Sequence, residues 1–313
     1  MPFTAKSGKF NASINVVEFG TGDKAVKIGG ENVLPLYTFD APIENAPKVG
    51  IEITDFGLEH EPECIKKYYE GCATLADMAR KAASMEGVDF LSFRMEGGDP
   101  NGANKSTEEL IGELKEIADA VDLPLVVCGC KNVEKDAELF SKAAEALNGK
   151  NAVILSAKEE NYKTVGAAAG LAYKQIVGAE SAVDINLAKQ LNVLISQLGV
   201  DSKSVVMNVG SAAVGYGFEY VISTMDRVKA AALQQGDANL QMPIITPVAS
   251  EAWGVKEAMA SETDAPEWGS QEERGIDMEV ETAMAVIAAG SNAVILKHPE
   301  SIKIISGLMK ELV

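Results

Sequence analysis

The stretch VGIEIT at residues 49–54 is a short apolar run of the kind that forms a buried strand. A polar turn and an amphipathic helical stretch follow it, and the same unit then recurs along the chain. The other candidate strands are residues 88–93, 125–128, 152–155, 181–183, 205–209, 244–246 and 293–296. Near-continuous apolar strands joined by helices are typical of a parallel sheet whose outer face is covered. Because eight such units close a barrel, we predict an α/β fold of the (β/α)8 TIM-barrel type.

The residues before the first strand follow a different pattern. Two segments between residues 14 and 28 alternate in polarity around a Gly-Thr-Gly-Asp turn at 20–23, which predicts a β-hairpin. We therefore divide the chain into an N-terminal hairpin and lead-in at 1–47 and a barrel at 48–313. We expect the hairpin to cover the bottom of the barrel.

The composition limits the possible partners. The 313 residues carry a net charge of −18, which argues against binding to nucleic acid or to an anionic membrane surface. No apolar run reaches the roughly 20 residues that span a bilayer, and the first ten residues lack the apolar core of a signal peptide. We therefore expect a cytoplasmic protein.

The four cysteines are too few for a disulfide scaffold. Neither the pair Cys64 and Cys72 nor the pair Cys128 and Cys130 has the Cys-x-x-Cys spacing of zinc and iron–sulfur sites. We predict that the chain holds no metal through its cysteines, and that Cys72 and Cys128 are buried core residues.

One connection is longer than the others. Residues 247–275 separate the seventh candidate strand from the next helical stretch and contain both tryptophans, Trp253 and Trp268. Extra length at the carboxyl end of a barrel strand projects over the mouth of the barrel. We predict that this segment is a lid or a partner surface, although each tryptophan could simply pack the segment onto the barrel.

In a parallel barrel, functional residues gather at the carboxyl ends of the strands. Here those positions form a polar rim without an evident catalytic set. Asp55, Glu96 and Asp184 are candidate acids or bases, but each could equally cap the helix that follows it. We therefore predict no catalytic residue in this chain.

The lysines and histidines at the rim are equally indecisive. Lys131, Lys158 and Lys297 are candidate Schiff-base lysines, and nothing in the sequence favours one over the others. His60 lies in an acidic run and His298 precedes a proline, and neither has a second metal ligand nearby in the sequence.

The segment GSAAVGYG at residues 210–217 is rich in glycine and opens the helix after the sixth candidate strand. Its backbone amides could receive an anionic or amide-bearing group at a helix N-terminus. It matches neither a Walker loop nor a dinucleotide fingerprint. Its small residues would allow a large flat ligand to approach closely.

Three segments together carry a family resemblance: KIGGE at 27–31 with the following Leu34-Pro35, DINLAKQLN at 184–192, and the 210–217 turn. With them the chain resembles the small (delta) subunit of the corrinoid/iron-sulfur protein of the anaerobic acetyl-CoA (Wood-Ljungdahl) pathway. The resemblance covers nearly the full length, and the 184–192 run is its most specific part.

The resemblance implies a methyl carrier in which a corrinoid (cobamide) lies between this barrel and a domain of a large subunit. Its cobalt takes the methyl group of methyltetrahydrofolate on a separate methyltransferase and delivers it to acetyl-CoA synthase. The iron–sulfur cluster belongs to the large subunit. The chain lacks an Asp-x-His-x-x-Gly segment, so we expect it to give cobalt no ligand.

Under this hypothesis the cofactor carries the chemistry, and the barrel mouth needs only to hold it. The rim residues that we expect to contact the corrinoid are Asp184, Asn186, Asn208, Gly210, Ser211, Thr246, Lys297 and His298.

Two alternatives stay open from the residues alone. The first is a self-sufficient, pterin-dependent TIM-barrel methyltransferase that uses Asp55, Asp184 and Asn208 on the pterin ring. The second is a lysine-dependent aldolase that uses one of the three rim lysines.

Overall fold

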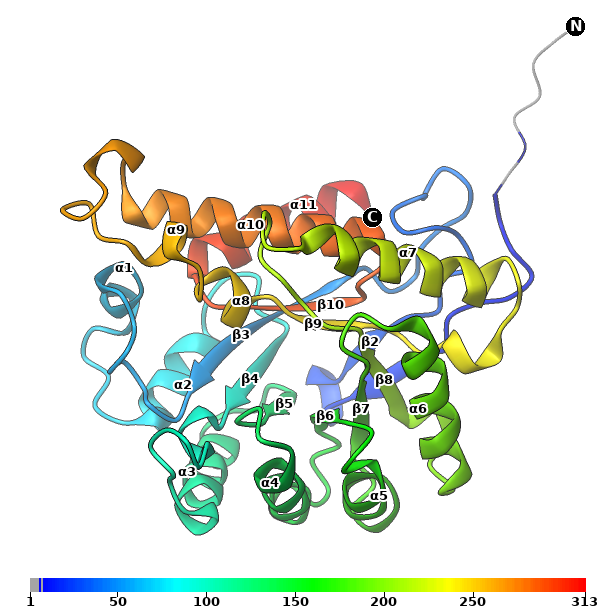
Figure 1. The fold of residues 1–313 in the computed structure, drawn as a ribbon, viewed down its shortest axis with the longest axis horizontal. Coiled ribbons are helices and arrows are strands. Elements are labelled where there is room, and N and C mark those ends of the chain that lie inside the picture. Colours follow the sequence, from blue (N-terminus) through cyan, green and yellow to red (C-terminus); the bar gives the residue numbers. More distant parts are fainter. Residues whose placement is uncertain (1–5, 7) are drawn as a thin grey trace, which may run out of the picture.

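The computed structural model describes residue 6 and residues 8–313. Eight parallel strands form a sheet that curves into a barrel (Figure 1). The strands are β3 (Lys48–Thr54), β4 (Phe90–Arg94), β5 (Leu125–Cys128), β6 (Val153–Ala157), β7 (Ile176–Glu180), β8 (Val205–Asn208), β9 (Ile245–Pro247) and β10 (Ala293–Leu296). They pair in the order β8-β7-β6-β5-β4-β3-β10-β9, and a parallel bridge between Met207 and Ile244 brings the two outer strands together. The predicted TIM barrel is confirmed.

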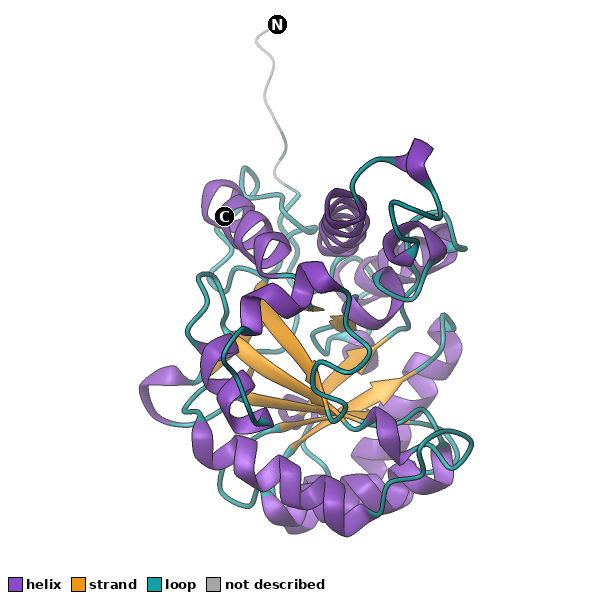
Figure 2. Cartoon of the chain, turned by 90° about the vertical axis from the view of Figure 1, so that its left-hand side faces the viewer, coloured by secondary structure: helices purple, strands orange, loops and turns teal. Residues whose placement is uncertain are grey.

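Helices surround this sheet on its outer face (Figure 2). The longer ones are α2 (Leu75–Ala83), α3 (Thr107–Ala120), α4 (Val133–Ala146), α6 (Ile185–Gln197), α7 (Phe218–Leu233), α10 (Gln271–Ala289) and α11 (Pro299–Leu312). Short helices are α1 (Glu63–Lys66), α5 (Tyr162–Val165, continued by a π-helical segment at Gly166–Ala172), α8 (Ala249–Ala252) and α9 (Lys256–Met259). Of the helices in the described part of the chain, none is long and apolar enough to cross a membrane.

Several of these helices begin at a residue whose side chain caps the first turn. Ser106 Oγ accepts the Glu109 N–H at the start of α3 (3.1 Å). Asp184 Oδ1 accepts the N–H groups of Asn186 (2.7 Å) and Leu187 (3.2 Å) at the start of α6. An oxygen in this position satisfies backbone donors that have no partner within the helix. Of the two roles considered for Asp184, the structure shows the cap.

The N-terminal hairpin consists of β1 (Val17–Phe19) and β2 (Val26–Ile28), which pair antiparallel. Its four apolar side chains are buried in one cluster with the residues that fill the barrel interior. Phe19 packs edge-on against Phe90 with ring centroids 5.5 Å apart. Gly50 leaves room for the Phe90 ring, because a Cβ at residue 50 would lie 2.1 Å from that ring. The hairpin therefore plugs the amino-terminal end of the barrel, as predicted.

One strand lies elsewhere than predicted. The fifth barrel strand is β7 at Ile176–Glu180, and residues 181–183 form the turn that follows it. Ala182 and Val183 have φ angles of +44° and +66°, which are incompatible with a strand. The prediction was wrong because Gly178 and Glu180 interrupt the apolar run of the true strand. Glu180 faces the barrel mouth, where an ion pair with Lys158 explains a charged residue in a strand.

Candidate functional site

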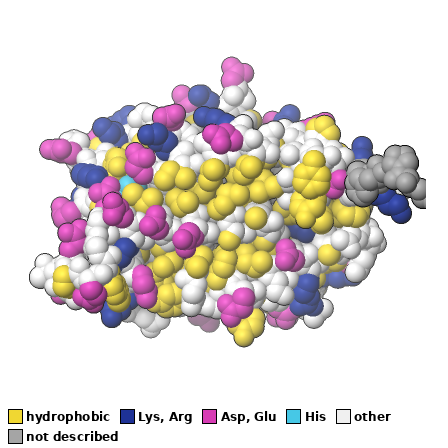
Figure 3. Space-filling view, turned by 90° about the horizontal axis from the view of Figure 1, so that it is seen from above, with side chains coloured by type: hydrophobic (Ala, Val, Ile, Leu, Met, Phe, Trp, Pro, Cys, Tyr) yellow, Lys and Arg dark blue, Asp and Glu magenta, His cyan; other side chains and the backbone are white. Residues whose placement is uncertain are grey.

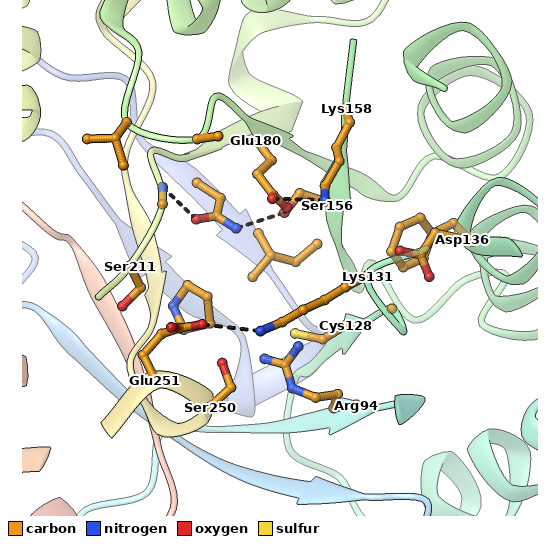
Figure 4. A pocket seen from close by; sticks show the side chains of 18 residues that line it. Arg94, Cys128, Lys131, Asp136, Ser156, Lys158, Glu180, Ser211, Ser250 and Glu251 are labelled. Carbon is orange, nitrogen blue, oxygen red and sulfur yellow. Dashed lines mark hydrogen bonds and ion pairs between the residues drawn. The ribbon is translucent and has the colours of Figure 1, made fainter. Parts of the chain in front are cut away.

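Two adjoining cavities occupy the mouth of the barrel at the carboxyl ends of the strands. The first, of about 290 Å³, is here named the Asn208 cavity and is drawn in Figure 4. The second, of about 360 Å³, is named the Lys297 cavity. Arg94, Gly129, Lys131 and Ser250 line both of them. The two cavities are therefore neighbouring parts of one mouth.

Each lysine and arginine that lines these cavities is paired with a carboxylate. The pairs are Arg94–Glu52 (2.8 Å), Lys131–Glu251 (3.2 Å), Lys158–Glu180 (3.3 Å) and Lys297–Glu61 (2.7 Å). The Lys131–Glu251 pair reaches across the mouth from the end of β5 to α8 (Figure 4). The charge of each cation is therefore compensated within the chain.

This pairing opposes the aldolase alternative. A Schiff-base lysine must lose its proton near neutral pH, which requires a lowered pKa. Burial alone would lower the pKa of Lys297, but the charges of Glu61 and Glu52 raise it above its usual value. Lys131 and Lys158 likewise face carboxylates. The geometry gives none of the three the environment of a nucleophilic amine.

A hydrogen-bond chain links three strand ends at the Asn208 cavity. The Gly210 N–H donates to Asn208 Oδ1 (3.1 Å), and Asn208 Nδ2 donates to Ser156 Oγ (3.0 Å). Ser156 Oγ in turn donates to Glu180 Oε2 (3.2 Å). Gly210 has a φ of +100°, which favours glycine at this sharp turn. These hydrogen bonds fix the Asn208 amide and leave one of its N–H groups free for the cavity.

Four of the predicted site residues line the cavities. Asn208, Gly210 and Ser211 line the Asn208 cavity, and Lys297 lines the other. The Ser211 hydroxyl is buried and has no hydrogen-bond partner within residues 8–313. A buried hydroxyl without a partner is uncommon in proteins, and it marks a place where a ligand group could bind.

The other four predicted residues lie away from the cavities. Asp184 and Asn186 are exposed at the start of α6. Thr246 points out of the barrel, because the neighbouring Pro247 lines the cavity and alternate residues of a strand face opposite sides. Its Oγ1 lies 2.8 Å from Ser291 Oγ. The fourth residue, His298, also lies outside the linings of the two cavities.

His298 serves the structure of the β10–α11 connection. Its Nδ1 accepts the Glu300 N–H at the start of α11 (3.1 Å), and its ring stacks on Trp253 with centroids 5.8 Å apart. The side chain is fully buried, and burial lowers its pKa to about 4 against the opposing effect of Glu272. His298 is therefore neutral at pH 7 and enclosed by protein.

The long segment after β9 lies over the mouth, as predicted. Its residues Ser250, Glu251, Trp253, Gly254 and Met259 line the cavities. The two tryptophans have packing roles. Trp253 is buried against α10, where a Cβ on Gly275 would lie 2.2 Å from its ring. The cations of Lys256 and Arg274 lie over the Trp268 ring, 5.0 Å and 5.6 Å from its centroid.

The cysteines near the mouth are unreactive. Burial raises the pKa of Cys128 to about 11 and that of Cys130 to about 12. The thiol form is a poor nucleophile and a poor metal ligand. Among the side chains described, no group of three or more His, Cys, Asp or Glu is arranged to hold a metal ion.

The pterin alternative loses most of its proposed residues. Asp55 is buried outside both cavities, where it pairs with Lys105 (3.1 Å) and accepts the Gly97 N–H (2.9 Å). Asp184 caps α6. Of the three residues proposed for the pterin ring, Asn208 alone lines a cavity.

The fold and the mouth together define a TIM-barrel protein with a polar, charge-compensated mouth. Residues 16–309 match the protein family described as CO dehydrogenase/acetyl-CoA synthase delta subunit. The chain belongs to this family.

Relatives in two organisms support this assignment. Subunit delta 1 of the acetyl-CoA decarbonylase/synthase complex of Methanosarcina thermophila is 30% identical over 94% of this chain and 67% of its own length. The delta subunit of the same complex in Methanothermobacter thermautotrophicus is 32% identical over 92% of this chain and 73% of its own length. The chain is therefore similar to delta subunits of acetyl-CoA decarbonylase/synthase complexes.

Solved structures with a similar fold include dihydropteroate synthases. The enzyme from Thermus thermophilus in complex with 4-aminobenzoate has a TM-score of 0.56 at 14% identity, and covers 95% of this chain and 100% of its own. The enzyme from Xanthomonas albilineans in complex with 7,8-dihydropteroate has a TM-score of 0.54 at 12% identity, and covers 85% of this chain and 94% of its own. At these identities the likeness concerns the fold alone.

Proposed function

We propose that this chain is the corrinoid-binding small subunit of a methyl carrier in the acetyl-CoA pathway, and that it acts in the cytoplasm. A large subunit, which carries the iron–sulfur cluster, would share the corrinoid with the barrel mouth. Methyltetrahydrofolate methyltransferase and acetyl-CoA synthase would be the partners before and after methyl transfer. The cobalt of the corrinoid would supply the methyl-carrying chemistry.

The observation that carries this proposal is the compensation of every cation lining the two cavities. It leaves a surface suited to binding rather than a reactive amine. Small residues at the Asn208 cavity, among them Ala182, Gly210 and Ser250, give a flat ring close access. The unpartnered Ser211 hydroxyl offers it a hydrogen bond. His298 is enclosed and would give cobalt no ligand.

Co-expression with the large subunit tests this proposal. We expect the purified pair to be coloured and to contain stoichiometric cobalt, measured by elemental analysis and visible absorption after anaerobic purification. The chain purified alone should retain little cobalt, because half of the site would be missing. A colourless pair would contradict the proposal. Calorimetric binding of methyltetrahydrofolate to the isolated chain would instead favour the pterin-dependent enzyme.

A partly exposed apolar face supports a subunit contact. Figure 3 looks down on α7, α10 and α11 and shows hydrophobic side chains gathered along these helices. Tyr220 on α7 and Ile304 and Leu312 on α11 are exposed large hydrophobic residues, and Met284 on α10 and Leu308 on α11 are partly buried. Extended apolar surface of this kind marks contact sites between proteins. We assign this face to the large subunit.

We expect Ile304→Asp to weaken co-purification with the large subunit, by about tenfold or more in Kd, because it would bury an unpaired charge in the contact. Lys303→Asp is the control, since it places the same side chain at an exposed neighbouring position of α11. Both variants should keep the circular dichroism and urea midpoint of the parent chain. Equal retention of the large subunit by both variants would remove this face from the proposed contact.

A further inference from the structure

The Asn208 cavity is lined by hydrogen-bond donors and acceptors that the described part of the chain does not fully use. We infer that this cavity binds primary carboxamide groups and discriminates against carboxylates. The inference rests on the proposed function, because a corrinoid carries carboxamide arms around its ring, and it names the part of that ligand which the barrel recognises.

Residues with unused donors line the cavity on two sides. Arg94 is 7% exposed, and its Nε and Nη2 lie 3.0 Å and 2.8 Å from the same oxygen of Glu52. A guanidinium has five N–H groups, so one edge stays available to a ligand (Figure 4). On the other side, Asn208 uses one of its two N–H groups on Ser156, and the Ser211 hydroxyl has no partner in the part of the chain that the structure describes.

Unused acceptors lie at the same cavity. Asp136 receives the N–H and Sγ of Cys130 on its Oδ1, which leaves Oδ2 for an outside donor. Glu251 faces Lys131 with Oε1 and keeps Oε2. In contrast, both oxygens of Glu180 are engaged, by Lys158 and by Ser156. A ligand group that both accepts and donates hydrogen bonds therefore fits this lining.

The charges favour a neutral ligand group. The cavity is lined by three cations, Arg94, Lys131 and Lys158, and by three carboxylates, Asp136, Glu180 and Glu251. An anion would find each cation already compensated and would face three carboxylates. A primary carboxamide is neutral and offers a carbonyl acceptor together with an N–H donor.

The test uses the chain in its complex with the large subunit, freed of corrinoid. It is titrated with dicyanocobinamide, which carries carboxamide arms, and with the same compound after hydrolysis of its arms to carboxylates. Binding is followed by visible absorption. We expect the carboxylate form to bind about tenfold or more weakly, because the unsatisfied donors and acceptors would be matched only by the amide.

The outcomes separate the two proposals. Equal affinity for both compounds would overturn the carboxamide preference and leave the corrinoid-binding role standing. Binding of neither compound would overturn the corrinoid-binding role and the preference that rests on it.

Variants assign the effect to the cavity. Asn208→Asp replaces the amide NH2 group, which serves both Ser156 and the cavity, by an acceptor at constant size, and should weaken dicyanocobinamide binding by about tenfold. Asn148→Asp makes the same exchange at an exposed position after α4, before β6, and should leave binding unchanged. Ser211→Ala removes a hydroxyl that bonds no described protein group, so it should fold normally and still bind several-fold more weakly. Unchanged affinity in Ser211→Ala and Asn208→Asp would overturn the inference.

Discussion

Replacing Lys229 with methionine should lower the free energy of unfolding by about 3–5 kcal/mol, because it leaves a buried carboxylate without its counter-charge. Lys229 on α7 is 1% exposed. Its Nζ lies 2.8 Å from Glu31 Oε1 and 2.9 Å from Asn292 Oδ1. Burial alone would raise the pKa of Glu31. The charge and hydrogen bond of Lys229 outweigh the effect of burial, so the pKa of Glu31 is lowered overall. Glu31 is therefore ionised and depends on Lys229.

The cluster is sensitive because it joins α7 to three other parts of the fold. Glu31 belongs to the lead-in after the hairpin, and Asn292 precedes β10. Asn292 Nδ2 donates to Glu31 Oε1 (2.8 Å), and Asn292 Oδ1 accepts the Ile244 N–H beside β9 (3.0 Å). Loss of Lys229 would thus disturb the lead-in and two strands together.

Urea unfolding followed by circular dichroism measures the effect, with Lys189→Met as the matched control. Lys189 forms an exposed ion pair with Asp237 (2.6 Å), and such pairs contribute about 1 kcal/mol or less. The double variant Lys229→Met/Glu31→Gln should recover much of the lost stability, since it leaves no buried charge unpaired. A loss in Lys229→Met no larger than that in Lys189→Met would show that the cluster is not a structural support.

The barrel was predictable because its signal is local and repeated. Seven of the eight strands overlap the apolar runs that the sequence shows, and each shift at their ends is small. The fifth strand was misplaced because Gly178 and Glu180 break its apolar pattern. The reason for Glu180, an ion pair with Lys158, lies in another strand and cannot be read from the residues around it.

The mouth was predictable only in part, because a strand end does not reveal which way a side chain points. Asn208 and Thr246 are both polar residues at strand ends, but Asn208 faces the interior and Thr246 faces the helices. The compensation of the mouth cations was also hidden. Lys131 and Glu251 are 120 residues apart, and only the closed barrel brings them together.

His298 illustrates the limit of reading function from residue type. Histidine at a strand end is a candidate ligand or base, yet here it caps a helix and stacks on Trp253. The same burial that excludes a ligand lowers its pKa, and this has a measurable consequence for stability.

We expect the stability of the chain to fall between pH 6.5 and about pH 4 by an amount that depends on His298. Its pKa is about 4 in the folded chain and 6.5 as the ordinary value. Between these values the unfolded chain binds a proton that the folded chain does not, so stability decreases as the pH falls. A shift of this size corresponds to about 3 kcal/mol at the lower end of the interval.

The variant His298→Asn isolates this contribution, because asparagine can still cap α11 while it does not titrate. Its free energy of unfolding should be lower than that of the parent at pH 7, owing to the lost stacking on Trp253, but it should fall less steeply with pH. The difference between the two chains should therefore shrink as the pH approaches 4. Burial raises the pKa of the nearby Glu279, which is present in both chains, so its contribution to the pH dependence largely cancels in this comparison. His60→Asn, at the other histidine and on the surface, controls for loss of an imidazole. Parallel pH curves for the parent and His298→Asn would show that His298 takes up its proton equally in the folded and unfolded chain, and would contradict its enclosure behind the barrel mouth.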